Sequence, residues 1–149
     1  MTISMYSTSV PVFTRMLGNA VGWLDKAQAH AEARKFSPDA YLVLRLAPDM
    51  LPLTSQIQIA SDTAKGAVAR LSGQEVPRWS DAEKTLDELR ERLRRTADYA
   101  RSVPAERFDG AESREILIPR RSGDPDLRQS IRPRKSIFPS STPACRSSA

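Results

Sequence analysis

Three long segments of the chain carry apolar residues at every third or fourth position, the spacing that places side chains on one face of an α-helix. They span about residues 9–34, 53–71 and 80–100. Their apolar positions are Phe13, Leu17, Ala20, Leu24, Ala27 and Ala31, then Leu53, Ile57, Ala60, Ala64, Ala67 and Leu71, and finally Leu86, Leu89, Leu93, Ala97 and Ala100. The pattern predicts an all-α fold with three long amphipathic helices.

Residues that can cap a helix indicate where these three helices begin. Either Ser7 or Ser9 can cap the first helix, and Asp49 can cap the second, because their side-chain oxygens accept hydrogen bonds from free backbone N–H groups. Ser80 and Glu83 have the spacing of a capping box at the start of the third helix. The charged outer face of that helix carries glutamate and arginine residues four apart, such as Glu88 with Arg92 and Glu91 with Arg95, and predicts a solvated surface.

Two shorter elements are expected between and after the long helices. Ser37-Pro38-Asp39 predicts the start of a short helix, because proline is favoured at the first helical position, and Pro48 then interrupts it. Residues 115–118, with the sequence Glu-Ile-Leu-Ile, predict a short strand that ends at Pro119. From residue 120 onward no helical or alternating pattern is present.

Residues 120–149 also differ from the rest of the chain in charge. They contain seven arginine and lysine residues and two aspartates, whereas residues 1–119 contain equal numbers of basic and acidic residues. The formal net charge of +5 therefore belongs to this tail and not to the helical part. We predict a disordered, basic, Ser/Pro-rich tail, and its lack of aromatic residues interleaved with arginines argues against nucleic-acid binding.

The location of the protein in the cell is also constrained by the sequence. No basic segment precedes an apolar run at the N-terminus, and no run approaches the 18 apolar residues of a membrane span. Cys145 is the only cysteine, so the chain cannot form an internal disulfide. We therefore expect a cytoplasmic protein with no membrane partner.

Three stretches carry a resemblance to a known family: SMYSTSVPVFTRMLGNA, RLAPDMLPLTSQIQIASDTAKGAVARLSG and FDGAESREILIP. Over residues 1–119 the chain resembles an uncharacterised bacterial family of unknown function in the DinB-like (DinB/YfiT) four-helix superfamily. The resemblance implies an up-down bundle with a short β element before the last helix. It also implies a possible metal function, since members of the superfamily often hold a divalent metal with three histidines.

The chain departs from this family after residue 119, where the resemblance implies a fourth helix rich in aromatic residues. A Ser/Pro-rich tail stands in its place, so we expect the fourth helix to be lost. A frameshift near codon 120 would explain together the lost periodicity, the change in charge and Cys145, and a truly diverged basic tail is the alternative. The coding DNA decides between them, because only a frameshift leaves an aromatic helix with histidine in another frame.

Loss of a fourth helix would leave the apolar sides of the other three helices without cover. The seam expected to be exposed consists of Phe13, Leu17, Ile57, Leu89 and Leu93. Since exposed apolar surface of this size promotes association, we expect either a homodimer through this seam or marginal stability.

Few residues of the chain are candidates for catalysis, metal binding or ligand binding. His30 is the only histidine, so one subunit cannot form a histidine triad, and we predict no metal centre and no cofactor. We interpret His30 as a helix-end residue without a catalytic role. The ligand-binding candidates lie on the second helix and are Gln56, Gln58, Asp62 and Lys65. Asp62 and Lys65 could line a pocket inside the bundle, between the first two helices, or could form an exposed ion pair.

These observations favour a protein of unknown function that acts as a small-ligand or partner-binding bundle, without a metal centre and not as an enzyme. Two alternatives stay open. The first is a DinB-like metal-dependent transferase or hydrolase that loss of the fourth helix has inactivated. The second is weak nucleic-acid binding through the basic tail. Neither a substrate nor a ligand can be named from the sequence.

Overall fold

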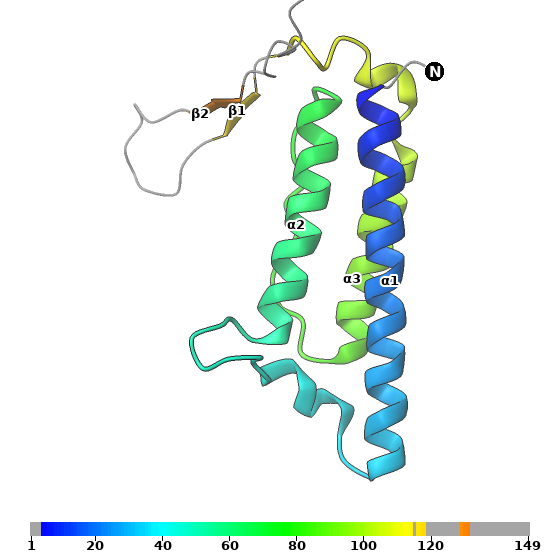
Figure 1. Ribbon diagram of the computed structural model, residues 1–149, viewed down its shortest axis with the longest axis vertical. Coiled ribbons are helices and arrows are strands. Elements are labelled where there is room, and N and C mark those ends of the chain that lie inside the picture. The colour runs from blue at the N-terminus through cyan, green and yellow to red at the C-terminus, as the bar shows by residue number, and fades with distance from the viewer. Residues whose placement is uncertain (1–3, 115, 119–128, 132–149) are drawn as a thin grey trace, which may run out of the picture. The chain divides into compact units, whose positions relative to one another are not determined.

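The computed structural model describes residues 4–114, 116–118 and 129–131, and divides the chain into two units, Met1–Ala111 and Glu112–Ala149. The first unit contains three α-helices, labelled α1, α2 and α3 in Figure 1, and two short 3₁₀ helices, η1 and η2. In chain order these are α1 (Met5–Arg34), η1 (Pro38–Val43), α2 (Leu53–Leu71), α3 (Leu86–Ser102) and η2 (Ala105–Phe108). The prediction of three long helices is confirmed.

The second unit contains a two-stranded antiparallel sheet, formed by β1 (Ile116–Ile118) and β2 (Gln129–Ile131). In its register Ile116 pairs with Ile131 and Ile118 with Gln129. The predicted strand at 115–118 is therefore present. Its partner β2 lies in the part of the chain for which the sequence predicted no regular structure, because three residues are too few to show an alternating pattern. The rest of the predicted tail lies outside the described residues, as does the place expected for a fourth helix.

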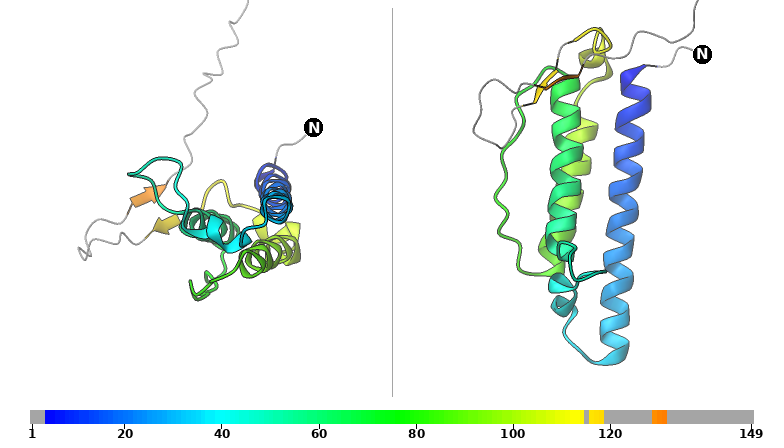
Figure 2. Two further views of the ribbon diagram at one scale, coloured as in Figure 1. Left: turned by 90° about the horizontal axis from the view of Figure 1, so that it is seen from below. Right: turned by 60° about the vertical axis from the view of Figure 1, so that its left-hand side comes forward.

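The order in which the helices are connected differs from the up-down order that the resemblance implied. α2 and α3 run in the same direction, and α1 runs antiparallel to both (Figure 1). Residues 74–84 form an extended segment, which we call the crossover, that returns alongside α2 before α3 begins (Figure 2). Eleven extended residues reach about 36 Å, which exceeds the length of about 28 Å of a 19-residue helix such as α2.

Side-chain hydrogen bonds fix this parallel order of α2 and α3. Ser61, near the middle of α2, lies 2.7 Å from the hydroxyl of Thr96 on α3. Gln74, just beyond the end of α2, accepts a bond of 3.4 Å from Tyr99 near the end of α3. In contrast, α1 packs mainly against α3 and less against α2. The crossover lies next to both α2 and α3, since Glu83 accepts from Gln58 of α2 and Trp79 contacts Arg95 of α3.

α1 begins earlier than the sequence predicted. Its N-cap is Ser4, whose hydroxyl accepts from the Ser7 N–H at 3.1 Å while the Ser7 hydroxyl accepts from the Ser4 N–H at 3.1 Å. The prediction of Ser7 or Ser9 as the cap is wrong, because Ser7 instead forms the second half of this capping box. Pro11 consequently lies in the second turn, where it leaves the Ser7 carbonyl without its usual helical partner, and solvent can reach the exposed Ser7.

α2 is preceded by the short helix η1, as Ser37 and Pro38 predicted, although η1 is of the 3₁₀ type. The N-cap of α2 is Pro52, so the prediction that Asp49 caps this helix is wrong. Asp49 instead lies in a turn that the Met50 N–H closes by donating to Ala47 at 3.0 Å. A capping residue must directly precede the helix, and Asp49 is too far from its start.

The start of α3 also differs from its prediction. Thr85 is the N-cap and accepts from the Glu88 N–H at 3.2 Å. The Leu86 N–H donates to a carboxylate oxygen of Asp39 at 3.0 Å, so a residue of η1 caps the first turn of α3. The predicted capping box of Ser80 and Glu83 is wrong, because both residues belong to the crossover and bind an arginine of α3, as described below.

The core of the first unit consists of two clusters of buried side chains. The larger contains Leu17, Leu24, Leu42, Ile57, Ala64, Leu86, Leu89, Leu93 and Ala97, and the other contains Val10, Val68, Ala100, Val103 and Phe108. The predicted exposed seam is wrong for Leu17, Ile57, Leu89 and Leu93, because three helices suffice to bury these residues against one another. Phe13 is half-buried and packs against both clusters.

The buried face of α2 is rotated from the one that the apolar spacing predicted. Ala60 is exposed, and Ser61 and Lys65 are buried together with Val68. Two polar residues therefore replace part of the expected apolar stripe, which places them next to α3 and the crossover. Within the described residues, no helix is both long and apolar enough to cross a membrane.

Candidate functional site

The guanidinium group of Arg92, on α3, lies at the centre of a polar cluster between α2, α3 and the crossover. Only 3% of the Arg92 side chain is exposed. Its Nη2 lies 2.8 Å from carboxylate oxygens of both Asp62 and Asp81, and its Nη1 lies 2.7 Å from Glu83. Nη1 also donates to the Ser80 carbonyl at 3.0 Å, and Nε donates to the Ser61 hydroxyl at 3.2 Å.

Most of the hydrogen-bonding capacity of Arg92 is used in this arrangement. An arginine has five N–H donors, one on Nε and two on each terminal nitrogen. Four of these donors bond to Ser61, Asp62, Ser80 and Glu83, and Asp81 is a fifth partner that forms an ion pair with Nη2 at 2.8 Å. Three of the five partners are carboxylates, so the cluster pairs one buried cation with three anions and fixes the crossover to both helices.

Lys65, on α2, extends the cluster toward Trp79 of the crossover. Its ammonium nitrogen lies 2.7 Å from Asp62 and 4.5 Å from the centre of the Trp79 ring. The guanidinium carbon of Arg95, on α3, lies 4.5 Å from the centre of the same ring. Both distances are within the range of a cation–π interaction. Tyr99 packs edge-on against Trp79, with ring centres 6.4 Å apart.

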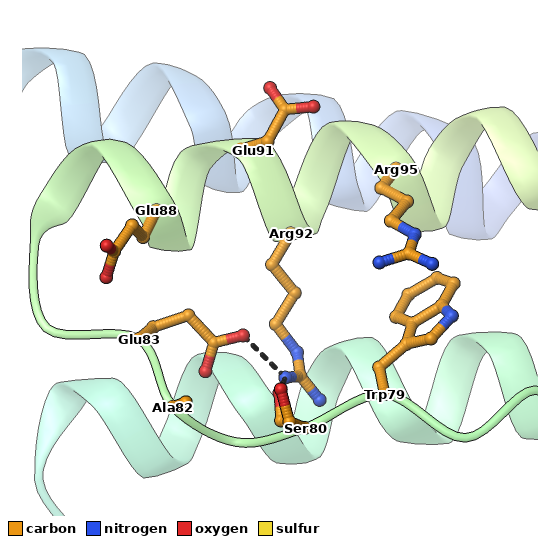
Figure 3. Close-up of a pocket in the computed structure, with 8 residues that line it drawn as sticks. All are labelled: Trp79, Ser80, Ala82, Glu83, Glu88, Glu91, Arg92 and Arg95. Atoms are coloured by element: carbon orange, nitrogen blue, oxygen red, sulfur yellow. Dashed lines mark hydrogen bonds and ion pairs between the residues drawn. The ribbon is translucent and has the colours of Figure 1, made fainter.

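A pocket of about 320 Å³ opens beside this cluster, between α3 and the crossover (Figure 3). It is lined by Trp79, Ser80, Ala82, Glu83, Glu88, Glu91, Arg92 and Arg95. Figure 3 shows the Glu83 and Glu88 side chains at one end and Trp79 with Arg95 at the other, with Arg92 between them. The Glu91 carboxylate points away from the crossover in the same view. This pocket differs from the one expected between the first two helices, which stays a prediction.

The environment of Glu83 and Arg92 favours the ionised form of both groups. Burial alone raises the pKa of Glu83, but the hydrogen bonds from Arg92 and Gln58, together with the charge of Arg92, outweigh burial and bring this pKa below its ordinary value of 4.5. Burial alone lowers the pKa of Arg92, and its bonds with Glu83 and Asp62 raise the pKa above its ordinary value. Burial also raises the pKa of Tyr99.

The four ligand-binding residues predicted from the sequence divide into two groups. Asp62 and Lys65 lie in the Arg92 cluster, and Gln58 joins it by donating to Glu83 at 2.8 Å. Gln56 is exposed and donates to the Leu51 carbonyl at 3.3 Å, away from these residues. The ion pair between Asp62 and Lys65 is present, although Lys65 itself is buried and not exposed.

Sequence reasoning missed Arg92 and Trp79, which define the site. Arg92 was assigned to a solvated outer face paired with Glu88, yet it follows Leu89 by three positions and precedes Thr96 by four, on the buried side of α3. That spacing was the available signal. Trp79 offered none, because its place follows from the course of the crossover.

A second buried arginine, Arg90, connects α3 to α1. Its Nε lies 2.8 Å from Asp25, and its Nη2 donates to Gln28 at 2.7 Å, both residues of α1. Nη1 pairs with Asp87 of α3 itself. α3 therefore uses two arginines, one toward each of the other helices, and only Arg92 borders the pocket.

His30 lies at the far end of α1, as expected for a helix-end residue. Its Nδ1 is 2.5 Å from the Tyr41 hydroxyl, so it holds η1 and does not approach the pocket. In the part of the chain that the structure describes, no three His, Cys, Asp or Glu side chains are arranged to hold a metal ion. The absence of a metal centre and of a cofactor stays a prediction.

Comparisons with known proteins show which family the chain belongs to. Residues 5–136 match a family profile described as "Domain of unknown function (DUF1993)". The match continues past residue 119, where we expected the resemblance to end. The chain is also similar to a DinB family member protein from Shewanella denitrificans whose crystal structure is known. The two sequences are 39% identical, and the structures superpose with a TM-score of 0.73. The match covers 85% of this chain and 70% of that chain. None of the curated proteins compared with the chain matches it.

The family match covers most of the chain, and the crystal structure shares both sequence and fold with it. The prediction of an uncharacterised DinB-like family is confirmed, as is the prediction of a DinB-like helical bundle. Neither comparison names a substrate or a bound group. The chain therefore belongs to the bacterial DinB-like family of unknown function described as DUF1993.

Proposed function

We propose that this chain is a small-ligand-binding helical bundle and that its binding site is the pocket between α3 and the crossover. The observation that supports this most directly is the Arg92 cluster, which connects both walls of the pocket to one buried guanidinium group with three carboxylate partners. Binding sites need walls that keep their positions before the ligand arrives. The pocket of about 320 Å³ is at the lower end of the size range for small-molecule sites.

A fragment screen followed by NMR tests this proposal on the full chain. We expect a subset of uncharged, cationic and anionic fragments to shift the indole N–H signal of Trp79, which lines the pocket. Ala82→Phe should abolish these shifts, because Ala82 also lines the pocket and a phenyl ring there would fill it. Ala33→Phe is the control, since Ala33 is exposed on α1 and away from the lining residues. Fragment binding that survives Ala82→Phe would contradict the proposed site.

We also propose that two copies of the chain associate through an apolar strip on α1. Val12, Met16 and Trp23 are 52%, 51% and 58% exposed, and their spacing of four and seven residues places them on one helix face. This strip replaces the seam that the sequence suggested, whose residues are largely buried. Large apolar side chains grouped on one exposed face favour association.

Sedimentation equilibrium measures this association directly. Trp23→Lys should shift the protein toward monomer, because burying a lysine without a partner in an apolar interface is unfavourable. Val43→Lys is the matched control, since Val43 is 73% exposed but lies on η1 and not on the strip. A monomer at all protein concentrations would refute the dimer, and equal effects of the two substitutions would refute the assigned surface.

We propose a cytoplasmic location for the protein. The single cysteine supports this, because a chain with one cysteine gains nothing from an oxidising compartment in which small domains rely on disulfides. Fractionation of cells that express the full-length protein tests the proposal. Recovery in the periplasmic or membrane fraction would contradict it.

A further inference from the structure

We infer that the ligand of this pocket is a small organic cation, with a primary ammonium or guanidinium head and an apolar or aromatic body. This inference rests on the proposed function, because it names the ligand class of the same pocket. It follows from three features of the lining residues: the donors already used, the acceptors still open, and the aromatic ring at the other end.

The first feature is that Arg92 is not available to an anionic ligand. Arginine in a pocket commonly binds carboxylate or phosphate groups through its N–H donors. Here four of the five donors of Arg92 already have a protein acceptor, and Nη2 also forms an ion pair with Asp81, so that three carboxylates surround the guanidinium group. An anion would have to displace Asp62, Asp81 or Glu83 from a side chain that is 3% exposed. Arg92 therefore offers little to an anion, and the other cation that lines the pocket is Arg95, which is exposed and packs over Trp79.

The second feature is an excess of negative charge with open acceptor positions. Five carboxylates, those of Asp62, Asp81, Glu83, Glu88 and Glu91, surround the pocket and its floor, against three cations, those of Lys65, Arg92 and Arg95. These eight side chains together carry a charge of −2. Among the described residues, neither Glu88 nor Glu91 forms an ion pair within 4.0 Å. Glu88 accepts one bond, from the Lys84 N–H at 2.5 Å, and a carboxylate can accept about four.

Glu83 adds a second acceptor at the same end of the pocket. One oxygen of its carboxylate accepts from Arg92 and the other from Gln58, which leaves a lone pair on each oxygen. Figure 3 shows the Glu88 side chain extending from α3 toward the crossover and the Glu83 side chain extending from the crossover toward Arg92, both at the same end of the pocket. An ammonium head between them would donate to both. Glu91 points away and contributes only its charge.

The third feature is Trp79, at the opposite end of the pocket from Glu88. Its ring already lies 4.5 Å from two cations, Lys65 and Arg95. Lys65 is buried and held by Asp62, whereas Arg95 is exposed and free to swing into solvent. The ring face covered by Arg95 can therefore receive the apolar or aromatic body of a ligand whose charged head lies at Glu83 and Glu88.

Three probes of nearly equal shape test the ligand class on the full chain: phenethylammonium, 3-phenylpropionate and 2-phenylethanol. We expect phenethylammonium to bind at least tenfold more tightly than either of the others, as measured from the shift of the Trp79 indole N–H signal. Affinity should fall with rising salt, because the attraction is partly electrostatic. Tighter binding of the anion or the alcohol at Trp79 would overturn the cationic class and leave the proposed pocket in place.

Two glutamate substitutions, one in the pocket and one outside it, test which carboxylate binds the charged head of the ligand. Glu88→Gln keeps the shape and the acceptor for Lys84 but removes the charge, and should weaken phenethylammonium at least fivefold. Glu106→Gln is the matched control, since Glu106 is exposed on η2 and does not line the pocket. Equal effects of the two substitutions, or no binding of the cation up to millimolar concentrations, would overturn the inference. The fragment screen described above tests the pocket independently of the ligand class. A wrong ligand class can therefore be distinguished from a wrong binding site.

Discussion

Single residues on α3 show that position, and not residue type, decides what an arginine contributes to stability. Arg92 is 3% exposed and bonded to three carboxylates, whereas Arg101 is 59% exposed and paired only with Asp98, at 3.0 Å. Arg92→Met should lower the free energy of unfolding by about 3 kcal/mol, because it leaves Glu83 partly buried without its cation. That figure is at the lower end for a buried pair, since Asp62 and Asp81 are about half exposed and regain water.

Urea unfolding followed by circular dichroism measures this difference. Arg101→Met is the matched control and should change the free energy of unfolding by about 0.5 kcal/mol or less, as is usual for exposed pairs. If both substitutions cost the same, the Arg92 cluster does not hold the crossover in place. The apolar stem of methionine preserves most of the packing of the arginine side chain in each variant.

The ionisation of Glu83 gives a second prediction at the residue scale. The folded-state pKa of Glu83 lies below its ordinary value of 4.5, so its charge stabilises the folded protein above pH 4.5. That contribution is lost as the pH falls through the lowered pKa. Glu83→Gln should therefore be less stable than the natural protein at pH 7, and the difference should shrink at pH 3. A difference that is the same at both pH values would contradict the role of the Glu83 charge.

At the scale of elements, Asp39 connects η1 to the start of α3. Its carboxylate accepts from the Leu86 N–H at 3.0 Å, which satisfies one of the free N–H groups of the first helical turn. Asp39→Ala should therefore cost about 1 kcal/mol of stability, the usual value of a helix cap. Asp49→Ala is the control and should cost less than about 0.5 kcal/mol, because Asp49 lies in a turn and caps no helix. Thermal denaturation of the two variants separates these outcomes.

The contrast between Asp39 and Asp49 also shows what the sequence could predict about the elements. Apolar spacing predicted the three helices, because burial of one face requires that periodicity whatever surrounds it. It did not predict the caps, because several serine and aspartate residues near each helix start could serve. The one that does is selected by tertiary contacts, as with Asp39, which is 47 positions from Leu86.

Only part of the candidate site could be predicted from the sequence, because most of its contacts join different elements. Asp62 and Lys65 are neighbours on one helix, so their spacing brought them together in the sequence analysis. Their partners Trp79 and Arg92 come from the crossover and from α3, and only the parallel course of α2 and α3 places them there. A sequence pattern within one helix carries no information about that connection.

At the scale of the whole molecule, the first unit contains its own core. Among residues 4–114 and 116, for which the structure describes exposure, every buried residue lies at or before Ala111, where the unit ends. Phe108 of η2 closes one end of that core, 2% exposed and with its ring centre 5.3 Å from that of Tyr6 on α1. A core that closes on itself should fold without the rest of the chain, since burial of apolar surface is the main driving force for folding.

A fragment of residues 1–114 should therefore unfold cooperatively in urea, with a free energy of unfolding within about 1 kcal/mol of the full chain. Phe108→Ala in this fragment should remove about 3 kcal/mol, because it leaves a cavity in the closed end of the core. Phe36→Ala is the matched control and should cost about 1 kcal/mol or less, since Phe36 is already 38% exposed. A fragment that stays unfolded while the full chain folds would mean that residues beyond 114 supply part of the core, and the self-contained first unit would be wrong.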